Sequence, residues 1–234
     1  ESQRELGLPV SSIQVEELKA HVDDVDLALA DRYEKELRHD VMAHVKAYAD
    51  ACPDAAPIIH LGATSCFVTD NGDILILRDA LKLLRGRLAQ AALALAEFAD
   101  QYKALPTLGY THFQPAQPTT VGKRAALWLQ DLLEDARELD RLIDDLRPLG
   151  SKGTTGTQAS FLALFEGDAE KVRALDLLTA RKMGFDRPVA LSGQTYSRKL
   201  DSRILHLLSA IAQSAAKFAG DIRLLAHLKE IEEP

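Results

Sequence analysis

Cysteine is scarce in this chain of 234 residues. Only Cys52 and Cys66 are present, and they form neither a CxxC pair nor a cysteine–histidine cluster with the spacing of zinc ligands. This scarcity argues against a disulfide framework and favours a reducing compartment, so we predict a cytoplasmic protein in which both thiols serve packing. No HExxH motif or other ligand spacing is present either, and we expect no metal site.

Long apolar runs and an excess of positive charge are also missing. Charged residues interrupt every apolar run before the roughly 18 residues that a membrane span needs, and no secretory apolar region opens the chain. The formal net charge of −7 provides no basic field for collecting nucleic acid or an anionic membrane. We therefore expect neither partner, although a local basic pocket for a small anion is compatible with this charge.

Apolar residues recur every three or four positions along most of the chain, which indicates amphipathic helices. Ser11 and Gln14 match a capping box, while prolines or glycines end most of the other patterns. We predict helices over about residues 11–22, 30–52, 74–105, 120–146, 168–184 and 204–225, and interpret "TDNGD" at 69–73 as capping and turn residues. No run shows the period-two alternation of a strand, so the sequence predicts an all-α fold.

Three of these helices exceed the usual length of roughly 8 to 20 residues. The last one carries a heptad seam of apolar side chains, made by Ile204, Leu208, Ile211, Ala215, Phe218, Ile222 and Leu225. We therefore predict an elongated helical bundle to which partner chains add further helices. A structural bundle without any chemistry fits the same pattern.

Polar residues gather in four loops outside the helical faces. The loops read "HLGATSCFVTDN" from His60, "TLGYTHFQPAQPTTVGKR" from Thr107, "GSKGTTGTQAS" from Gly150 and "SGQTYSRK" from Ser192. Loops that lead into helix N-termini suit anion binding, because free backbone N–H groups and hydroxyls face the ligand there. "GSKGTTGT" does not match GxxxxGK[ST] and follows a helix, so it is not a P-loop.

Several hydroxyl residues in these loops are candidates for binding an anionic ligand. We interpret Thr119 and Thr120 as helix caps. The number of the other hydroxyls exceeds what capping needs, which favours a functional role for Thr64, Ser65, Thr111, Thr154 and Thr155.

His112 is the candidate for acid–base chemistry, because it is the only side chain in its loop that titrates near neutral pH. The predicted helix between the Thr64/Ser65 loop and the His112 loop is roughly 45 Å long. The two loops therefore cannot meet at one small-molecule site within a single chain. If both serve one substrate, neighbouring subunits must bring them together.

The loop motifs resemble those of adenylosuccinate lyases, within the fumarase/aspartase superfamily. The resemblance rests on the first three loop sequences together with "SGQTYSRKLD" and "DIRLLAHLKEIEEP", and it runs from about Arg32 to Pro234. It implies an elongated bundle of the fumarase/aspartase type, whose long helices form the core of a homotetramer with active sites shared between subunits. Residues 1–60 are then the remainder of an N-terminal helical domain, and residues 61–234 the first part of the central bundle domain.

The resemblance also implies a reaction and a set of site residues. The reaction is the cofactor-free β-elimination of fumarate from adenylosuccinate, which yields AMP, and from succinyl-aminoimidazole-carboxamide ribotide, both in purine biosynthesis. His112 corresponds to the general acid. The substrate-binding positions are Arg38, His39 and Asp40, the succinyl-carboxylate ligands Thr64 and Ser65, the substrate amide Gln194, and their neighbours Thr111 and His60.

This chain departs from the family pattern at both ends. The family's general base is a serine on a mobile glycine-rich loop, and that loop would begin shortly after Pro234. An N-terminal Arg-Tyr phosphate contact and further C-terminal arginines are missing as well. We therefore expect a truncated lyase that is inactive on its own; the alternatives are a non-catalytic helical oligomerisation scaffold or another superfamily lyase, such as argininosuccinate lyase.

Overall fold

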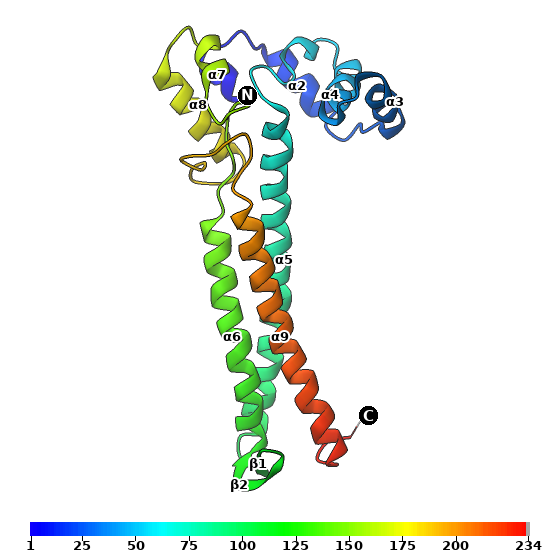
Figure 1. Ribbon diagram of the computed structural model, residues 1–234, viewed down its shortest axis with the longest axis vertical. Helices are drawn as coiled ribbons and strands as arrows, with labels where there is room; N and C mark the ends of the chain where they lie inside the picture. Colours follow the sequence, from blue (N-terminus) through cyan, green and yellow to red (C-terminus); the bar gives the residue numbers. More distant parts are fainter. Residues whose placement is uncertain (233–234) are drawn as a thin grey trace. The chain divides into compact units, whose positions relative to one another are not determined.

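The computed structural model describes residues 1–232, and most of them lie in helices (Figure 1). The chain divides into two compact units, one made by residues 1–76 and 147–197, the other by residues 77–146 and the segment from Arg198 onwards. The predicted domain boundary at residue 61 concerns the longer protein and stays a prediction. None of the helices in residues 1–232 combines the length and the apolar character that a membrane span requires.

The first unit contains mostly short helices. They are α1 (Ser2–Glu5), α2 (Ser12–Ala20), α3 (Leu27–Leu37), α4 (Asp40–Ala51), the 3-10 turn η1 (Ala56–Ile58), the first turns of α5 (Ser65–Gln101), α7 (Ala159–Leu164) and α8 (Ala169–Lys182). A core of Phe161, Phe165, Val172 and Leu175 joins α7 to α8. Ser11 begins α2 with the predicted capping box, and Asp168 caps α8 as its side chain accepts from Lys171 N–H.

The single helix predicted over residues 30–52 is wrong, because the chain breaks there into α3 and α4. Arg38 ends α3 in the left-handed conformation (φ 53°), and His39 is the N-cap of α4. The two helices contact each other, and the Tyr33 hydroxyl donates to Asp50 at 2.5 Å. The apolar spacing continues across the break because both helices bury a face, so periodicity alone does not show the turn.

The interpretation of residues 69–73 as a turn is also wrong, since α5 already begins at Ser65 and runs for 37 residues. Two buried polar side chains sit inside its first turns. Asp70 accepts the backbone N–H of Tyr196 at 2.8 Å, and Asn71 both donates to and accepts from the backbone of Gly150. These distant partners satisfy polar groups that would otherwise favour a cap or turn.

The second unit is built from long helices: the rest of α5, α6 (Val121–Asp145) and α9 (Lys199–His227). They run side by side around a core of Ala125, Trp128 and Leu225, against which Leu95 of α5 also packs (Figure 1). Within the predicted heptad seam of α9, Ile204 and Leu225 are buried. Leu208 and Phe218 remain 40% and 36% exposed in the isolated chain.

A two-stranded antiparallel hairpin replaces the loop that the sequence predicted between α5 and α6. Its strands are β1 (Pro106–Thr111) and β2 (Gln114–Thr120), paired from Pro106↔Thr120 to Thr111↔Gln114 with an irregularity at Gly109. Within residues 1–232, neither strand pairs with a third one. The prolines of β2, which lack a backbone N–H, therefore remove no hydrogen bond to another strand. The fold is mostly helical as predicted, but the expectation that it contains no strand is wrong.

Candidate functional site

His112 lies at the tip of the hairpin. With Phe113 it forms the two-residue connection between the strands, and both residues have left-handed backbone angles, φ 50° and 59°. That pattern matches a type I′ turn, which normally uses Asn and Gly, because other side chains are strained there. Thr111, His112 and Phe113 are exposed, and His112 makes no hydrogen bond to any residue in the described part of the chain. The imidazole is therefore presented on a strained turn and left unpaired.

Phe113 contributes one contact that holds this turn. Its ring stacks on Tyr110, with 6.4 Å between the ring centroids and 30° between the planes. Such an aromatic pair contributes about 0.5–1.5 kcal/mol, which offsets part of the backbone strain at the tip.

Thr64 and Gln194 meet in the first unit, directly before the first residue of α5. Gln194 Nε2 donates to Thr64 Oγ1 at 3.0 Å, and Thr64 is buried. Ser65 is the first residue of α5, so its hydroxyl lies beside the unpaired backbone N–H groups of that helix start. Two residues before Gln194 in the chain, the Ser192 hydroxyl is buried without a hydrogen-bond partner among the described residues. These groups can together hold a carboxylate by neutral donors and the helix dipole.

Arg38, His39 and Asp40 lie at the junction of α3 and α4, and all three are exposed. His39 Nδ1 accepts the backbone N–H of Met42 at 3.3 Å. The same ring nitrogen also lies 3.3 Å from Asp40 Oδ1, so both the backbone of α4 and a carboxylate contact this imidazole. Arg38 adopts the left-handed conformation at the C-cap of α3, and such backbone strain in a non-glycine residue occurs often at functional sites.

His60 is half-buried and also has a left-handed backbone, with φ 66°. Burial, and then the neighbouring His39, lower the pKa of His60 below its ordinary value. Desolvation and a second imidazole both disfavour the charged ring, so His60 is neutral near pH 7. It lines a cavity of about 400 Å³ whose wall is largely apolar, and of the predicted site residues His60 is the one that this wall includes.

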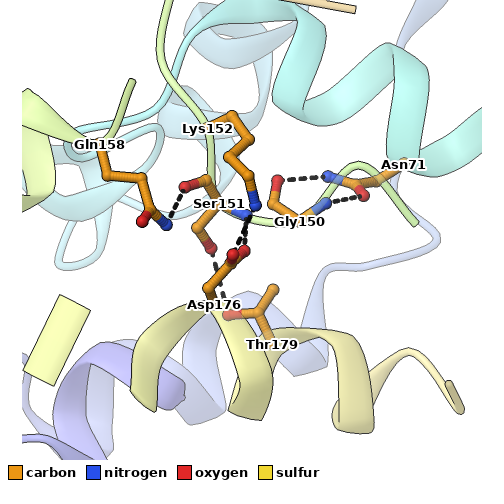
Figure 2. A network of polar contacts seen from close by, with 7 residues as sticks. All are labelled: Asn71, Gly150, Ser151, Lys152, Gln158, Asp176 and Thr179. Carbon is orange, nitrogen blue, oxygen red and sulfur yellow. Dashed lines mark hydrogen bonds and ion pairs between the residues drawn. The ribbon is translucent and has the colours of Figure 1, made fainter. Parts of the chain in front are cut away.

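A buried polar network fixes the start of the loop that carries Thr154 and Thr155 (Figure 2). Lys152 forms an ion pair with Asp176 of α8, and the two side chains are only 6% and 14% exposed. Asp176 also accepts the Ser151 backbone N–H at 2.7 Å, while Gln158 donates to the Ser151 carbonyl at 2.9 Å. The loop is therefore tied to α8 and to itself at its base.

The other end of this network lies in α5. Asn71 Nδ2 donates to the Gly150 carbonyl at 3.1 Å, and its Oδ1 accepts the Gly150 N–H at 2.9 Å (Figure 2). Sequence reasoning missed Asn71, Lys152 and Asp176. Each of them looks like a surface residue in the sequence, and the only signal was the unusual density of polar residues around Gly150. Thr154 and Thr155 themselves are exposed.

Thr119 and Thr120 differ in role. Thr120 is the N-cap of α6, since its Oγ1 accepts the Lys123 N–H at 3.1 Å. The capping prediction is thus confirmed for Thr120, and no such bond involves Thr119 within residues 1–232. No group of three or more histidine, cysteine or acidic side chains in the same residues is arranged to hold a metal ion.

Comparison with known proteins places these features in a family. A family model described as Lyase matches residues 20–233. The adenylosuccinate lyase of Saccharomyces cerevisiae is 53% identical over 236 residues, covering 100% of this chain and 49% of the yeast protein. That of Schistosoma mansoni is 50% identical, with 100% of this chain and 49% of its own length covered. The chain spans about half the length of the curated relatives it matches.

Solved structures share the fold. The structure of a fumarate lyase from Mesorhizobium sp. BNC1 matches with a TM-score of 0.82 at 23% identity, over 96% of this chain and 51% of that one. The 3-carboxy-cis,cis-muconate lactonizing enzyme from Pseudomonas putida matches with a TM-score of 0.77 at 26% identity, over 96% and 50%. The helical fold is thus that of the fumarase/aspartase superfamily, as predicted.

Proposed function

The chain belongs to the Lyase family, and on this premise we propose that it forms about half of an adenylosuccinate lyase. The observation that carries the proposal is the 53% identity to the yeast enzyme over the whole of this chain. The proposed reaction eliminates fumarate from adenylosuccinate to give AMP, and from succinyl-aminoimidazole-carboxamide ribotide to give the free carboxamide ribotide. It needs no cofactor.

His112 is the proposed general acid. Elimination leaves an amine that must take up a proton, and a positioned imidazole accelerates such a step about 10²- to 10⁴-fold. An exposed, unpaired imidazole on a strained turn suits this role, because nothing within the described chain competes for its proton. Thr111 lies beside it and is proposed as a substrate contact.

The first unit supplies the proposed binding groups. Thr64, Ser65 and Gln194 offer hydroxyl and amide donors at the start of α5, which suits a succinyl carboxylate and the charge that builds on it during proton removal. Arg38, His39 and Asp40 would contact the rest of the substrate. The base that removes the Cβ proton is proposed to be a serine in the part of the protein beyond this chain.

We further infer that the complete protein is a homotetramer with shared active sites. Support comes from α5, which is continuous for 37 residues and hence about 55 Å long. Apolar side chains along the long helices also stay exposed, with Leu83 and Leu205 at 66% and 64%. A helical core formed with other copies would bury them. The two free thiols support a cytoplasmic location.

The direct experiment is a fumarate-release assay on the full-length protein. We expect turnover with adenylosuccinate and with the succinyl-carboxamide ribotide, and none with argininosuccinate as the matched control substrate. Turnover of argininosuccinate alone would point to the other superfamily lyase. A folded oligomer that releases no fumarate from any of the three would instead identify a scaffold.

Shared sites have a separate test. Full-length His39→Ala and His112→Gln variants are each expected to be inactive, and mixing them after mild dissociation should restore part of the activity through sites that combine the intact residues. Mixing two preparations of the same variant is the control. Mixed tetramers that form and stay inactive would contradict the shared-site proposal.

A further inference from the structure

A half-buried ion pair lies at the base of the hairpin. Arg124 of α6 and Glu230, just beyond α9, approach to 2.8 Å between Nη1 and Oε2, and their side chains are 17% and 19% exposed. Both side chains of some other ion pairs in this unit are much more exposed, for example Arg203–Asp145 at 55% and 61%. Charged hydrogen bonds that are partly shielded from water are stronger than exposed ones, so this pair is a firm link between α6 and the end of α9.

The same two side chains also bind strand β1. Arg124 Nη2 donates to the Leu108 carbonyl at 2.9 Å and contacts the Thr107 hydroxyl at 3.4 Å. Thr107 Oγ1 donates to Glu230 Oε2 at 3.1 Å. The Arg124 guanidinium therefore contacts three acceptors: Glu230 Oε2, the Thr107 hydroxyl and the Leu108 carbonyl. A lysine ammonium cannot reproduce this planar geometry.

Protonation states support this arrangement. Burial opposes ionisation of Glu230, but the hydrogen bonds from Arg124 and Thr107 outweigh it and lower the pKa of Glu230 below its ordinary value. Burial, and then a hydrogen bond to Glu230, raise the pKa of Tyr110 above its ordinary value. Glu230 is consequently a carboxylate near neutral pH, with donors from α6 and from β1.

Packing alone does not fix the hairpin tip. A cavity of about 370 Å³ lies between the hairpin, α6 and α9, with Tyr110, Phe113 and Trp128 among its walls. The ladder is irregular at Gly109, between the anchored residues and the turn, and the turn itself is strained. Because the hairpin borders a cavity and its turn is strained, its position depends on the hydrogen bonds at its base.

We propose that Arg124 and Glu230 are positioning residues that fix the hairpin and thereby the placement of His112 for proton transfer to the leaving amine. This inference rests on the proposed lyase function and adds two residues outside its set of substrate contacts. A displacement of about 1 Å at a reacting group can lower the rate about 100-fold, so loss of the anchor acts through geometry and leaves the chemistry of the imidazole unchanged.

The test uses the full-length protein and a double-mutant cycle. Arg124→Lys keeps the positive charge but cannot bond Glu230 and the Leu108 carbonyl together. We expect kcat for adenylosuccinate to fall roughly 10- to 100-fold, while KM changes less than about twofold. In a His112→Gln background the same substitution should change the residual kcat less than about threefold, because the residue through which it acts is gone.

Control variants separate positioning from folding. Arg203→Lys alters an exposed pair of the same unit and should leave kcat unchanged. Glu230→Gln keeps the size of the side chain and an oxygen that can accept, but removes the negative charge. It should lower kcat by a smaller factor than Arg124→Lys does. It also provides a second variant if Arg124→Lys folds poorly. Tetramer content and thermal midpoint are measured for each protein.

Two results would overturn the inference. One is an unchanged kcat in both Arg124→Lys and Glu230→Gln. The other is an equal loss with and without His112, which would indicate a general structural role. If the unsubstituted protein itself releases no fumarate, the proposed function fails along with the inference, and this outcome is recognised before any variant is made.

Discussion

The loop from Gly150 to Gln158 and the hairpin from Pro106 to Thr120 differ in structure, although both are rich in threonine and follow a long helix. In the loop, Gly150, Ser151 and Lys152 are buried and bonded to α5 and α8. In the hairpin, the anchoring bonds lie at the base and the tip is exposed. Polar composition therefore does not tell a loop with buried polar side chains from one that exposes them; the partners of each side chain do.

The first way to test this contrast is to remove the imidazole at the exposed tip. We expect His112→Gln in the full-length protein to lower kcat by about 10²- to 10⁴-fold, the usual contribution of a general acid, while adenylosuccinate still binds. Steady-state fumarate release and a binding isotherm measure the two effects. His227→Gln, at an exposed histidine on α9, is the matched control. Unchanged turnover would remove His112 from the mechanism.

The second test removes a buried partner from the loop. Lys152→Met leaves the Asp176 carboxylate without its counter-ion in a site that is only 14% exposed. Such a loss typically destabilises a protein by about 3 kcal/mol or more. Urea unfolding of the full-length protein at fixed concentration measures it.

The control for this variant lies on the same helix. Arg173→Met breaks the ion pair between Arg173 and Glu170, two side chains that are 63% and 83% exposed. Because the pair is exposed, we expect the free energy of unfolding to change by less than about 1 kcal/mol. Equal losses for the two variants would mean that burial does not distinguish the loop network from a surface pair.

The smallest expected effect concerns the end of the hairpin. Thr120→Ala removes the hydroxyl that caps α6 and should destabilise the protein by about 1 kcal/mol. Thr119→Ala removes a hydroxyl that caps no helix within the described residues, and we expect a smaller change in the same unfolding experiment. A larger loss from Thr119→Ala than from Thr120→Ala would refute the assignment of the cap.

Helices could be predicted from the sequence where apolar periodicity and capping residues mark both of their ends. The pattern from Thr120 to Leu146 corresponds to α6, and the Ser11/Gln14 capping box begins α2 as expected. The break at Arg38 was not predicted, because apolar spacing continues through it. The early start of α5 was not predicted either, because Asp70 has its backbone partner 126 residues away.

The candidate site divides along the same line. His112 could be selected from its loop because its chemistry is evident in the residue type. The Thr64–Gln194 contact spans 130 residues, and the sequence offered only a resemblance to suggest that the two residues share a site. Arg124 and Glu230 were not predicted at all, since charged side chains normally point to solvent.

The sequence by itself determined the mostly helical fold, the extents of α2, α6 and α8, and the residue types available for acid–base chemistry, because periodicity, capping motifs and side-chain type are local properties. Only the tertiary structure decided that "TLGYTHFQPAQPTT" pairs into a hairpin, that Lys152 is a buried partner of Asp176, and that Arg124 anchors β1. The Lys152 and Arg124 contacts depend on hydrogen bonds and burial between segments distant in the chain. The hairpin is local, but its His112–Phe113 turn lacks the Asn-Gly type of sequence that normally marks such a turn.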